Sequence, residues 1–197
     1  MTVLKAMIKW FPWRKKDMDK NRIVQITDTK YADIFAAIYN SANELFAAAE
    51  QSAAGADIFV PQIASDMNFM KIQENGDFSA FMSYHRYGNF YELTSLYVKK
   101  EYQQNGIGFQ LLSHMEALLR NNDVIFVKVL KNAPWAQNFY GKHGFRPLNS
   151  PHCPADNTKY LSPDFSCHKL REAAASLNIV EKSYSTVFYK ISSSAKR

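Results

Sequence analysis

The chain has 197 residues, and 24 Lys and Arg against 18 Asp and Glu give it a formal charge of +6. Most of this charge lies at the ends: residues 1–20 carry six basic and two acidic side chains, and Lys196 and Arg197 add two positive charges. Residues 21–195 hold sixteen charges of each sign and are neutral. Basicity of the main body therefore gives no reason to expect nucleic acid as a partner.

At 47% hydrophobic and 21% charged residues, the composition is that of an ordinary globular domain. No apolar run approaches the roughly 18 residues that a membrane span requires, so we expect no stable membrane insertion. Lys5 and Lys9 interrupt any apolar segment of a secretion signal. Two cysteines without such a signal lead us to expect a reducing, cytoplasmic location.

The first 20 residues form a basic, aromatic N-terminal extension in which apolar residues at helical spacing stop at Pro12. We expect one domain over residues 21–192 and a short tail over 193–197. The domain opens with a strand at Arg22–Ile26. A helix is predicted from Thr29 to Asn43, because its apolar residues recur at the spacing of one helix face.

Three strands follow and should form an antiparallel meander. They are predicted at Phe69–Gln73, Phe78–Tyr87 and Phe90–Val98. The turns between them contain Asn75-Gly76 and Gly88-Asn89, pairs that are typical of tight hairpins.

The remainder alternates helices and strands. A polar loop at Lys99–Gly108 precedes a helix at Phe109–Leu119, a strand at Asp123–Leu130, a helix at Pro134–His143 and a strand at Phe145–Leu148. Residues 149–182 form a loop-plus-helix insertion before the last strand, Ser185–Ile191. The predicted class is α/β (α+β): a mixed, mostly antiparallel sheet of about six to seven strands with helices on both faces.

The loop before the helix at Phe109 carries the pattern Gln103-x-x-Gly106-x-Gly108. Glycines at a helix start let a ligand approach the backbone, and the free N–H groups of the first turn favour an anion such as a diphosphate. The pattern lacks the third glycine of a dinucleotide fingerprint and the Gly-Lys-Ser/Thr end of a P-loop. A tight turn without a ligand would explain the same two glycines.

A second pattern, Ala136-x-x-Phe139-Tyr140-x-Lys142-x-Gly144-Phe145, lies on the helix that enters the next strand. In this order, the two patterns resemble the signatures of the GNAT family of acetyl-CoA-dependent N-acyltransferases. The resemblance covers roughly residues 23–148, and the segment 186–191 resembles the last strand of that family.

The resemblance implies a GNAT-like fold, acetyl-CoA as cosubstrate and no metal. The strand before the loop would pair with pantetheine and then splay from its neighbour, and the loop N–H groups would hold the pyrophosphate. The implied coenzyme-binding residues are Leu96, Tyr97, Val98, Gln103, Gln104, Asn105, Gly106, Ile107 and Gly108.

Tyr140 occupies the position that commonly donates a proton to the departing thiolate in this family, although an aromatic core residue would look the same in the sequence. The family often has an asparagine seven residues earlier, where this chain has Ala133. Asn132 and Asn138 lie near that position and are the candidates for the pantetheine contact.

Glu92 resembles the base glutamate of the histone-type members, and a solvated strand carboxylate is the alternative. Strict alternation would place Glu92 on one strand face with Thr94, Leu96 and Val98. His85, on the neighbouring strand, is expected to be an exposed strand residue that lines the acceptor side, and not a catalyst.

The function implied is transfer of an acetyl group to a primary amine, on a small molecule or a protein, by direct attack. The alternative is a GNAT-like domain that binds acyl-CoA as a sensor or scaffold with little turnover. The loops expected to meet the acceptor, 44–68 and 149–182, carry no signature of a particular amine. A homodimer is left open, and the pairs His152-Cys153 and Cys167-His168 lack the spacing of a zinc site.

Overall fold

The computed structural model describes residues 22–43, 53–149 and 166–192. The N-terminal extension 1–20, part of the first acceptor loop (44–52), most of the loop in the insertion (150–165) and the tail 193–197 lie outside the described residues.

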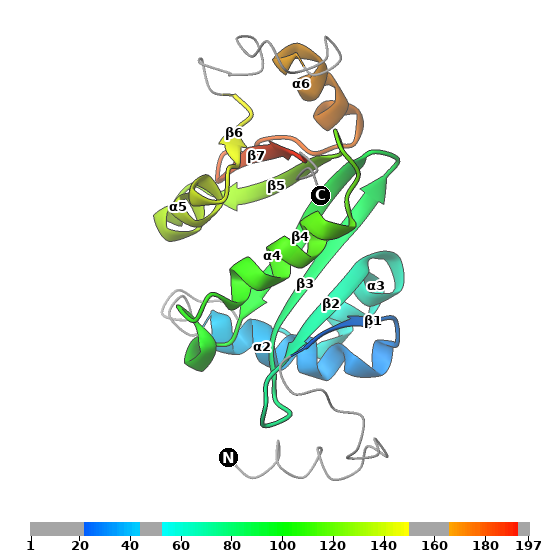
Figure 1. The fold of residues 1–197 in the computed structure, drawn as a ribbon, viewed down its shortest axis with the longest axis vertical. Coiled ribbons are helices and arrows are strands. Elements are labelled where there is room, and N and C mark those ends of the chain that lie inside the picture. Colours follow the sequence, from blue (N-terminus) through cyan, green and yellow to red (C-terminus); the bar gives the residue numbers. More distant parts are fainter. Residues whose placement is uncertain (1–21, 44–52, 150–165, 193–197) are drawn as a thin grey trace.

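The described residues form one seven-stranded sheet with the order β1-β2-β3-β4-β5-β7-β6 (Figure 1). The strands are β1 (Ile23–Ile26), β2 (Met67–Ile72), β3 (Phe78–Tyr87), β4 (Phe90–Val98), β5 (Val124–Leu130), β6 (Arg146–Pro147) and β7 (Ser185–Ile191). Neighbours pair antiparallel except β4 and β5, which run parallel. The predicted fold class is confirmed, and both hairpin turns hold a glycine at positive φ, 88° at Gly76 and 66° at Gly88.

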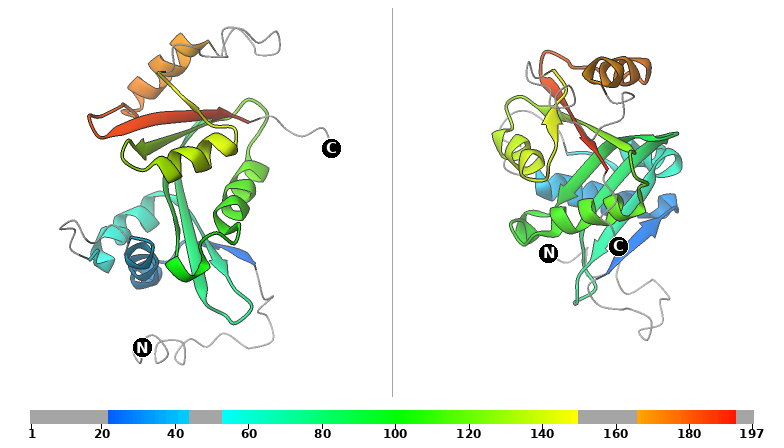
Figure 2. Two further views of the ribbon diagram at one scale, coloured as in Figure 1. Left: turned by 90° about the vertical axis from the view of Figure 1, so that its left-hand side faces the viewer. Right: turned by 45° about the horizontal axis from the view of Figure 1, so that its top comes forward.

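Helices cover both faces of the sheet (Figures 1 and 2). They are α2 (Ala32–Ala42), α3 (Phe59–Ser65), α4 (Ile107–Leu118), α5 (Pro134–Lys142) and α6 (Cys167–Ser176), with short 3-10 helices η1 (Thr29–Tyr31), η2 (Ala56–Ile58) and η3 (Lys100–Tyr102). The α4 and α5 helices pack on one face in a single apolar cluster. On the other face, α2 and α3 pack over β2 and β3, and α6 packs over β5 and β7.

Local sequence explains where the helices begin. The predicted Thr29–Asn43 helix starts as the 3-10 turn η1, and the Asp28 side chain caps it by accepting a hydrogen bond from the Lys30 N–H at 2.9 Å. Pro61 lies inside the first turn of α3, where its missing N–H costs nothing, so that helix begins before the proline and not after it. The Ser166 hydroxyl caps α6 in the same way, by accepting from Lys169 N.

The parallel pair β4–β5 is the irregular part of the sheet. Pairing runs only from Phe90–Val124 to Leu93–Val127, although β4 continues to Val98 and β5 to Leu130. Beyond Leu93 the two strands part, within β4 and before the Leu96–Val98 segment after which the family resemblance implied a splay.

A bulge lies at the point where β4 leaves β5. Ser83 pairs with Ser95 and Tyr84 with Leu93, so Thr94 has no partner on β3. The bulge reverses the alternation of side chains: Leu93, Leu96 and Val98 all pack on the α4 side. Glu92 therefore lies on the opposite face from Leu96 and Val98, and the face assignment based on strict alternation is wrong.

The buried half of α4 should carry much of the stability of this layer. Leu111 is fully buried in the α4 cluster, whereas Leu118 on the same helix is 52% exposed. Leu111→Ala should lower the free energy of unfolding by about 2–5 kcal/mol, because it removes buried methyl groups and leaves a cavity. The matched change Leu118→Ala should cost less than about 1 kcal/mol. Urea denaturation midpoints measure both, and equal losses would contradict the assigned packing.

Candidate active site

A set of unpaired backbone N–H groups lies at the N-terminus of α4. Within the described residues, none of the N–H groups from Gln104 to Phe109 donates a hydrogen bond to the chain. Gly106, at φ 72°, precedes the first residue of α4, and Gln104 also has a positive φ of 64°. These two left-handed residues turn the loop so that its donors gather at the positive end of the helix dipole, an arrangement that suits an anion.

Gln103, the first residue of the Gly-rich pattern, has a structural partner. Its Nε2 donates a hydrogen bond to the Val98 carbonyl oxygen at 3.0 Å, which fastens the loop to the end of β4. Lys99 N–H continues the ladder by donating to the Ser79 carbonyl at 2.9 Å. The Gln103 side chain thus positions the loop, while its neighbours supply the free donors.

Gly108 lies in the first turn of α4 and faces α5. A Cβ on Gly108 would lie 3.5 Å from the Phe139 ring, which is ordinary van der Waals contact. A Cβ on Gly106 would meet nothing within 4 Å, but it would have to adopt positive φ. The constraint at Gly106 is therefore its backbone conformation, and it is independent of packing inside the chain.

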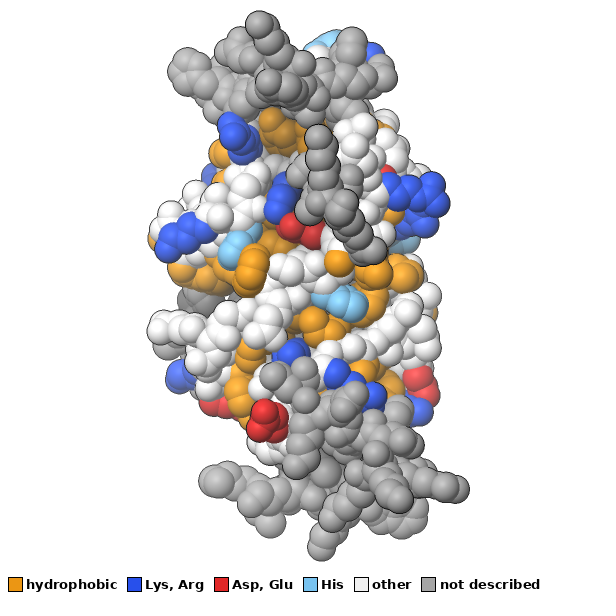
Figure 3. All heavy atoms as spheres, viewed as in Figure 1, with side chains coloured by type: hydrophobic (Ala, Val, Ile, Leu, Met, Phe, Trp, Pro, Cys, Tyr) orange, Lys and Arg blue, Asp and Glu red, His pale blue; other side chains and the backbone are white. Residues whose placement is uncertain are grey.

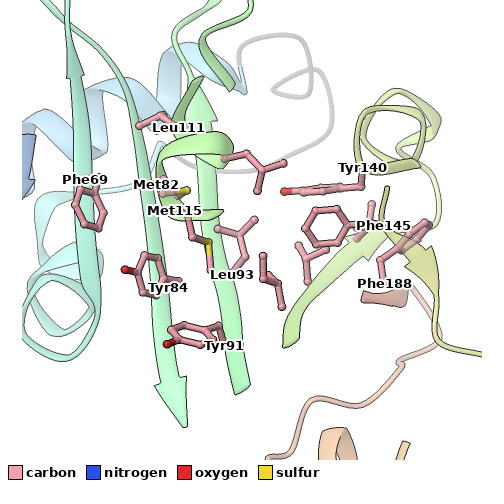
Figure 4. Packing of buried hydrophobic residues seen from close by; sticks show 14 of the residues in the cluster. Phe69, Met82, Tyr84, Tyr91, Leu93, Leu111, Met115, Tyr140, Phe145 and Phe188 are labelled. Atoms are coloured by element: carbon pink, nitrogen blue, oxygen red, sulfur yellow. The ribbon is translucent and has the colours of Figure 1, made fainter. Parts of the chain in front are cut away.

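Tyr140 extends from α5 with its hydroxyl directed toward α4 and β4 (Figure 4). The side chain is buried in the cluster between these helices and contacts Phe139 and Phe145, with ring centroids 5.1 and 5.3 Å away. Burial raises the pKa of Tyr140 well above the ordinary tyrosine value, and the neighbouring Tyr97 phenol adds to the shift. Burial likewise raises the pKa of Tyr97 to about 12. Both phenols are therefore fully protonated at neutral pH.

Asn132 and Asn138, the two asparagines predicted to contact pantetheine, are both exposed. Neither side chain makes a hydrogen bond within the described residues. The neighbouring Gln137, which sequence reasoning missed, makes two contacts instead. Its Nε2 lies 3.2 Å from the Leu130 carbonyl oxygen and 2.9 Å from that of Lys131, so it ties α5 to the end of β5. Asn132 and Asn138 keep their side chains available to a ligand.

Glu92 is on the sheet face opposite Tyr140, because Tyr91 and Leu93 on either side of it face the α4 cluster. Its Oε1 forms an ion pair with Lys128 Nζ on β5 at 2.7 Å, and its side chain is only 10% exposed. The two candidate catalytic residues therefore lie on opposite sides of the sheet, on either side of the β4–β5 pair.

Sequence reasoning also missed a polar cluster on the Glu92 face, formed by Asp66, His85 and Thr94. The Asp66 carboxylate lies 3.0 Å from His85 Nδ1 and accepts a hydrogen bond from Thr94 Oγ1 at 2.7 Å. His85 and Thr94 are 19 and 28 positions from Asp66 in the chain, and only the register of the sheet brings them together. No local pattern in the sequence could have identified them.

On the opposite face, hydrophobic side chains are exposed in a band around α4, with histidine side chains among them (Figure 3). Phe109, at the start of α4, is 51% exposed and stacks on His143 of α5 with ring centroids 4.7 Å apart. Burial is the main cause that lowers the pKa of His143, and Lys190 lowers it further. His143 is therefore mostly neutral at pH 7, and this band adds little charge beside the anion-binding N–H groups.

A mixed sheet that parts after a bulge, with free N–H groups at the following helix and a buried tyrosine across the gap, defines an acyltransferase of the acyl-CoA type. The sequence profile of the Acetyltransferase (GNAT) family matches residues 35–145. The chain belongs to this family. No curated protein matches the chain in sequence.

Solved structures of the same fold are distant in sequence. The ribosomal-protein-S18-alanine N-acetyltransferase of Escherichia coli is 20% identical, with 90% of this chain and 97% of that one covered and a TM-score of 0.56. The PaiA N-acetyltransferase of Thermoplasma acidophilum, solved with coenzyme A, is 13% identical over 86% and 99% of the two chains, with a TM-score of 0.57. An acetyltransferase of Thermus thermophilus is also 13% identical, covers 87% and 97%, and has a TM-score of 0.59. These likenesses establish the fold.

None of the described helices combines the length and apolar character that crossing a membrane would require. Residues 22–43, 53–149 and 166–192 contain no cluster of three or more His, Cys, Asp or Glu side chains that could hold a metal ion.

Substitution of Gly106 tests the N–H cluster at α4. Gly106→Val should raise the Kd for coenzyme A at least about tenfold, ~1.4 kcal/mol, because a β-branched residue disfavours positive φ and its side chain would block close approach. Gly88→Val is the matched control: Gly88 also has positive φ and open space, but it lies in the β3–β4 turn at the other end of β4. Isothermal titration with coenzyme A measures both, and unchanged affinity in Gly106→Val would refute the assignment.

Proposed function

We propose that this chain is an N-acetyltransferase that moves the acetyl group of acetyl-CoA to a primary amine by direct attack, acting in the cytoplasm. The observation that carries the proposal is the gap between β4 and β5, which has anion-binding N–H groups at one end and a protonated, buried tyrosine beside it. Such a gap lets a thioester reach both sides of the sheet, so that coenzyme and acceptor can meet without a covalent enzyme intermediate.

The sequence assigned the coenzyme pyrophosphate to the N–H groups from Gln103 to Gly108; those of Gln104 to Gly108 are free to bind it, whereas the Gln103 N–H already donates to the Lys100 carbonyl oxygen at 3.3 Å. Beyond Leu93, β4 has no strand partner on the side that β5 leaves, so this edge offers unpaired backbone groups. Pantetheine amides can pair with such an edge as an added strand would, along Leu96, Tyr97 and Val98. Asn132 and Asn138 are the exposed side chains of the α5 segment that we assign to the far side of the pantetheine arm.

Tyr140 would donate its proton to the departing thiolate. A phenol with a raised pKa is a weak acid, but the same dry surroundings disfavour a free thiolate and so raise the proton affinity of the departing sulfur. The hydroxyl needs no activating partner, because its role is to supply a proton that burial has kept in place.

The acceptor amine would approach from the opposite face, because α4, α5 and the coenzyme occupy the Tyr140 side. Glu92 lies on this face, and the sequence nominates it as the base. Its ion pair with Lys128 and its low exposure mean that a proton from the amine would have to reach it through water. The Asp66 carboxylate on this face suits a cationic acceptor, whereas the charge of Glu92 is balanced by Lys128.

An amine screen tests the function itself. Purified protein with acetyl-CoA should release thiol in the presence of at least one amine among spermidine, tyramine, L-lysine, kanamycin and a peptide with an N-terminal alanine. Mass spectrometry of the amine should show one added acetyl group. Tight binding of coenzyme A with no thiol release on any of them would instead favour a sensor or scaffold, and no binding would exclude both.

Tyr140→Phe tests the assigned acid. It should lower kcat by about 10²- to 10³-fold and leave the affinity for acetyl-CoA nearly unchanged, because it removes only the proton that the thiolate takes. Tyr184→Phe is the matched control, since Tyr184 is 57% exposed. Because the pKa of Tyr140 is raised, loss of its proton should not reduce the wild-type rate below about pH 10. Equal turnover in Tyr140→Phe and wild type would rule out the role.

A further inference from the structure

On the acceptor face, one imidazole is held in a single orientation by a buried carboxylate. His85 Nδ1 lies 3.0 Å from Asp66 Oδ1, and the side chains are 35% and 7% exposed, respectively. A carboxylate can only accept a hydrogen bond, so in the neutral imidazole the proton between Asp66 Oδ1 and His85 Nδ1 is bonded to Nδ1. The lone pair is then on Nε2, which makes no hydrogen bond or ion pair within the described residues.

The carboxylate that orients His85 is itself fixed to two elements, α3 and β4. Asp66 ends α3, where the Ser65 hydroxyl lies 3.1 Å from Oδ1. Thr94, the bulged residue of β4, donates to Oδ2 at 2.7 Å. The pair is therefore fastened to the bulge at which β4 leaves β5, so His85 on β3 lies one strand away from the edge of β4 where the thioester would lie.

His85 and Glu92 are opposite each other in the β3–β4 register, so both side chains belong to the same region of the acceptor face. They differ in availability. Glu92 Oε1 is held by Lys128 and its side chain is 10% exposed, whereas His85 presents a free nitrogen and is 35% exposed. Of the two, His85 is the group that an amine can touch directly.

We propose that His85 is the general base that accepts a proton from the acceptor ammonium, and that Asp66 is its positioning residue. This inference rests on the proposed function, since it names the group that deprotonates the amine of that reaction. It assigns His85 a role that its place on an ordinary-looking strand does not predict. The arrangement is that of a carboxylate–imidazole pair, in which the carboxylate sets the tautomer and stabilises the imidazolium.

The proton balance closes with these two groups and Tyr140. The ammonium gives one proton to His85 Nε2, and the neutral amine forms a C–N bond with the thioester carbonyl carbon. As the C–S bond breaks, the thiolate takes the phenolic proton of Tyr140. The second proton on the amine nitrogen returns to the phenolate through water, and His85 releases its proton to solvent.

The charged and titratable groups that face His85 are Asp66 at the end of α3, Tyr87 on β3, Glu92 on β4 and Lys128 on β5. Burial raises the pKa of Tyr87, and Glu92 and Asp66 raise it further, so Tyr87 stays neutral through the physiological range.

The test compares His85→Asn with a histidine elsewhere that also faces a carboxylate. Asparagine keeps a donor for Asp66 but has no counterpart of Nε2. With the best amine of the screen, His85→Asn should lower kcat/KM for the amine about 10²-fold and leave coenzyme A affinity unchanged. The control His168→Asn should change nothing, because His168 is 81% exposed on α6 and pairs only with Glu172 within the described residues.

A measurement without turnover separates this inference from the proposed function. Long-range ¹H–¹⁵N spectra of the full chain with bound coenzyme A should show His85 as the Nδ1–H tautomer, and Asp66→Asn should shift it toward Nε2–H. An Nε2–H tautomer in the wild type, or full activity of His85→Asn beside a large loss in Glu92→Gln, would overturn the role of His85 while the acetyltransferase stands. Thiol release on no amine would overturn the proposed function and this inference together.

Discussion

Four residue pairs hold β4 to β5, and the parting of the two strands after Leu93 determines most of what surrounds it. A parallel pair that ends early leaves backbone groups without a ladder partner, and in a sheet interior that would be costly. Here the neighbouring elements limit the cost. The Gln103 side chain donates to the last carbonyl of β4, and the Gln137 side chain donates to the carbonyls at the end of β5. Within the described residues, the edge of β4 without a strand partner therefore runs only from Leu93 to Val98. The open edge is therefore confined to the length of a ligand arm.

The gap divides the sheet into two parts, and side-chain packing has to hold these parts together. The apolar cluster under α4 and α5 does most of this work, because it contains residues from β2, β3 and β4 on one side and from β5 and β7 on the other. An ion pair between Lys190 Nζ of β7 and Glu116 Oε1 of α4, at 2.6 Å and largely shielded from water, crosses between the halves. One apolar cluster thus spans the gap on the Tyr140 face. On the opposite face, the same place carries the polar cluster of Asp66, His85 and Thr94.

The elements with a strong local signal could be predicted from the sequence. Both hairpins follow from Asn75-Gly76 and Gly88-Asn89, and the ends of β3, β4 and β7 agree with the predicted ranges. The parting of the strands and the fold class came from the two family patterns. The bulge did not, because Thr94 sits in an unbroken run of strand-forming residues, and a bulge depends on the register against β3.

Side-chain pairings across the sheet were beyond prediction for the same reason. Asp66 was one of several acidic residues in a loop expected to meet the acceptor, His85 looked like an exposed strand residue, and Gln103 looked like a ligand contact. Each acquired its partner only when segments 5 to 28 residues apart were placed side by side. Functional residues on a sheet are therefore harder to predict than those on a loop–helix junction such as Gly106, where the neighbours in space are neighbours in sequence.

The two faces of the gap differ in a way that suits a single displacement. On the Tyr140 side, burial disfavours the phenolate, so that face keeps a proton ready and no carboxylate of the proposed site lies there to take it. On the other side, Asp66, Glu92 and the free Nε2 of His85 make a face that can accept a proton and attract a cation. The proposed acid and base thus act on the reacting atoms from opposite sides of the gap, because His85 and Glu92 alternate with Tyr84, Tyr91 and Leu93, which face the α4 cluster.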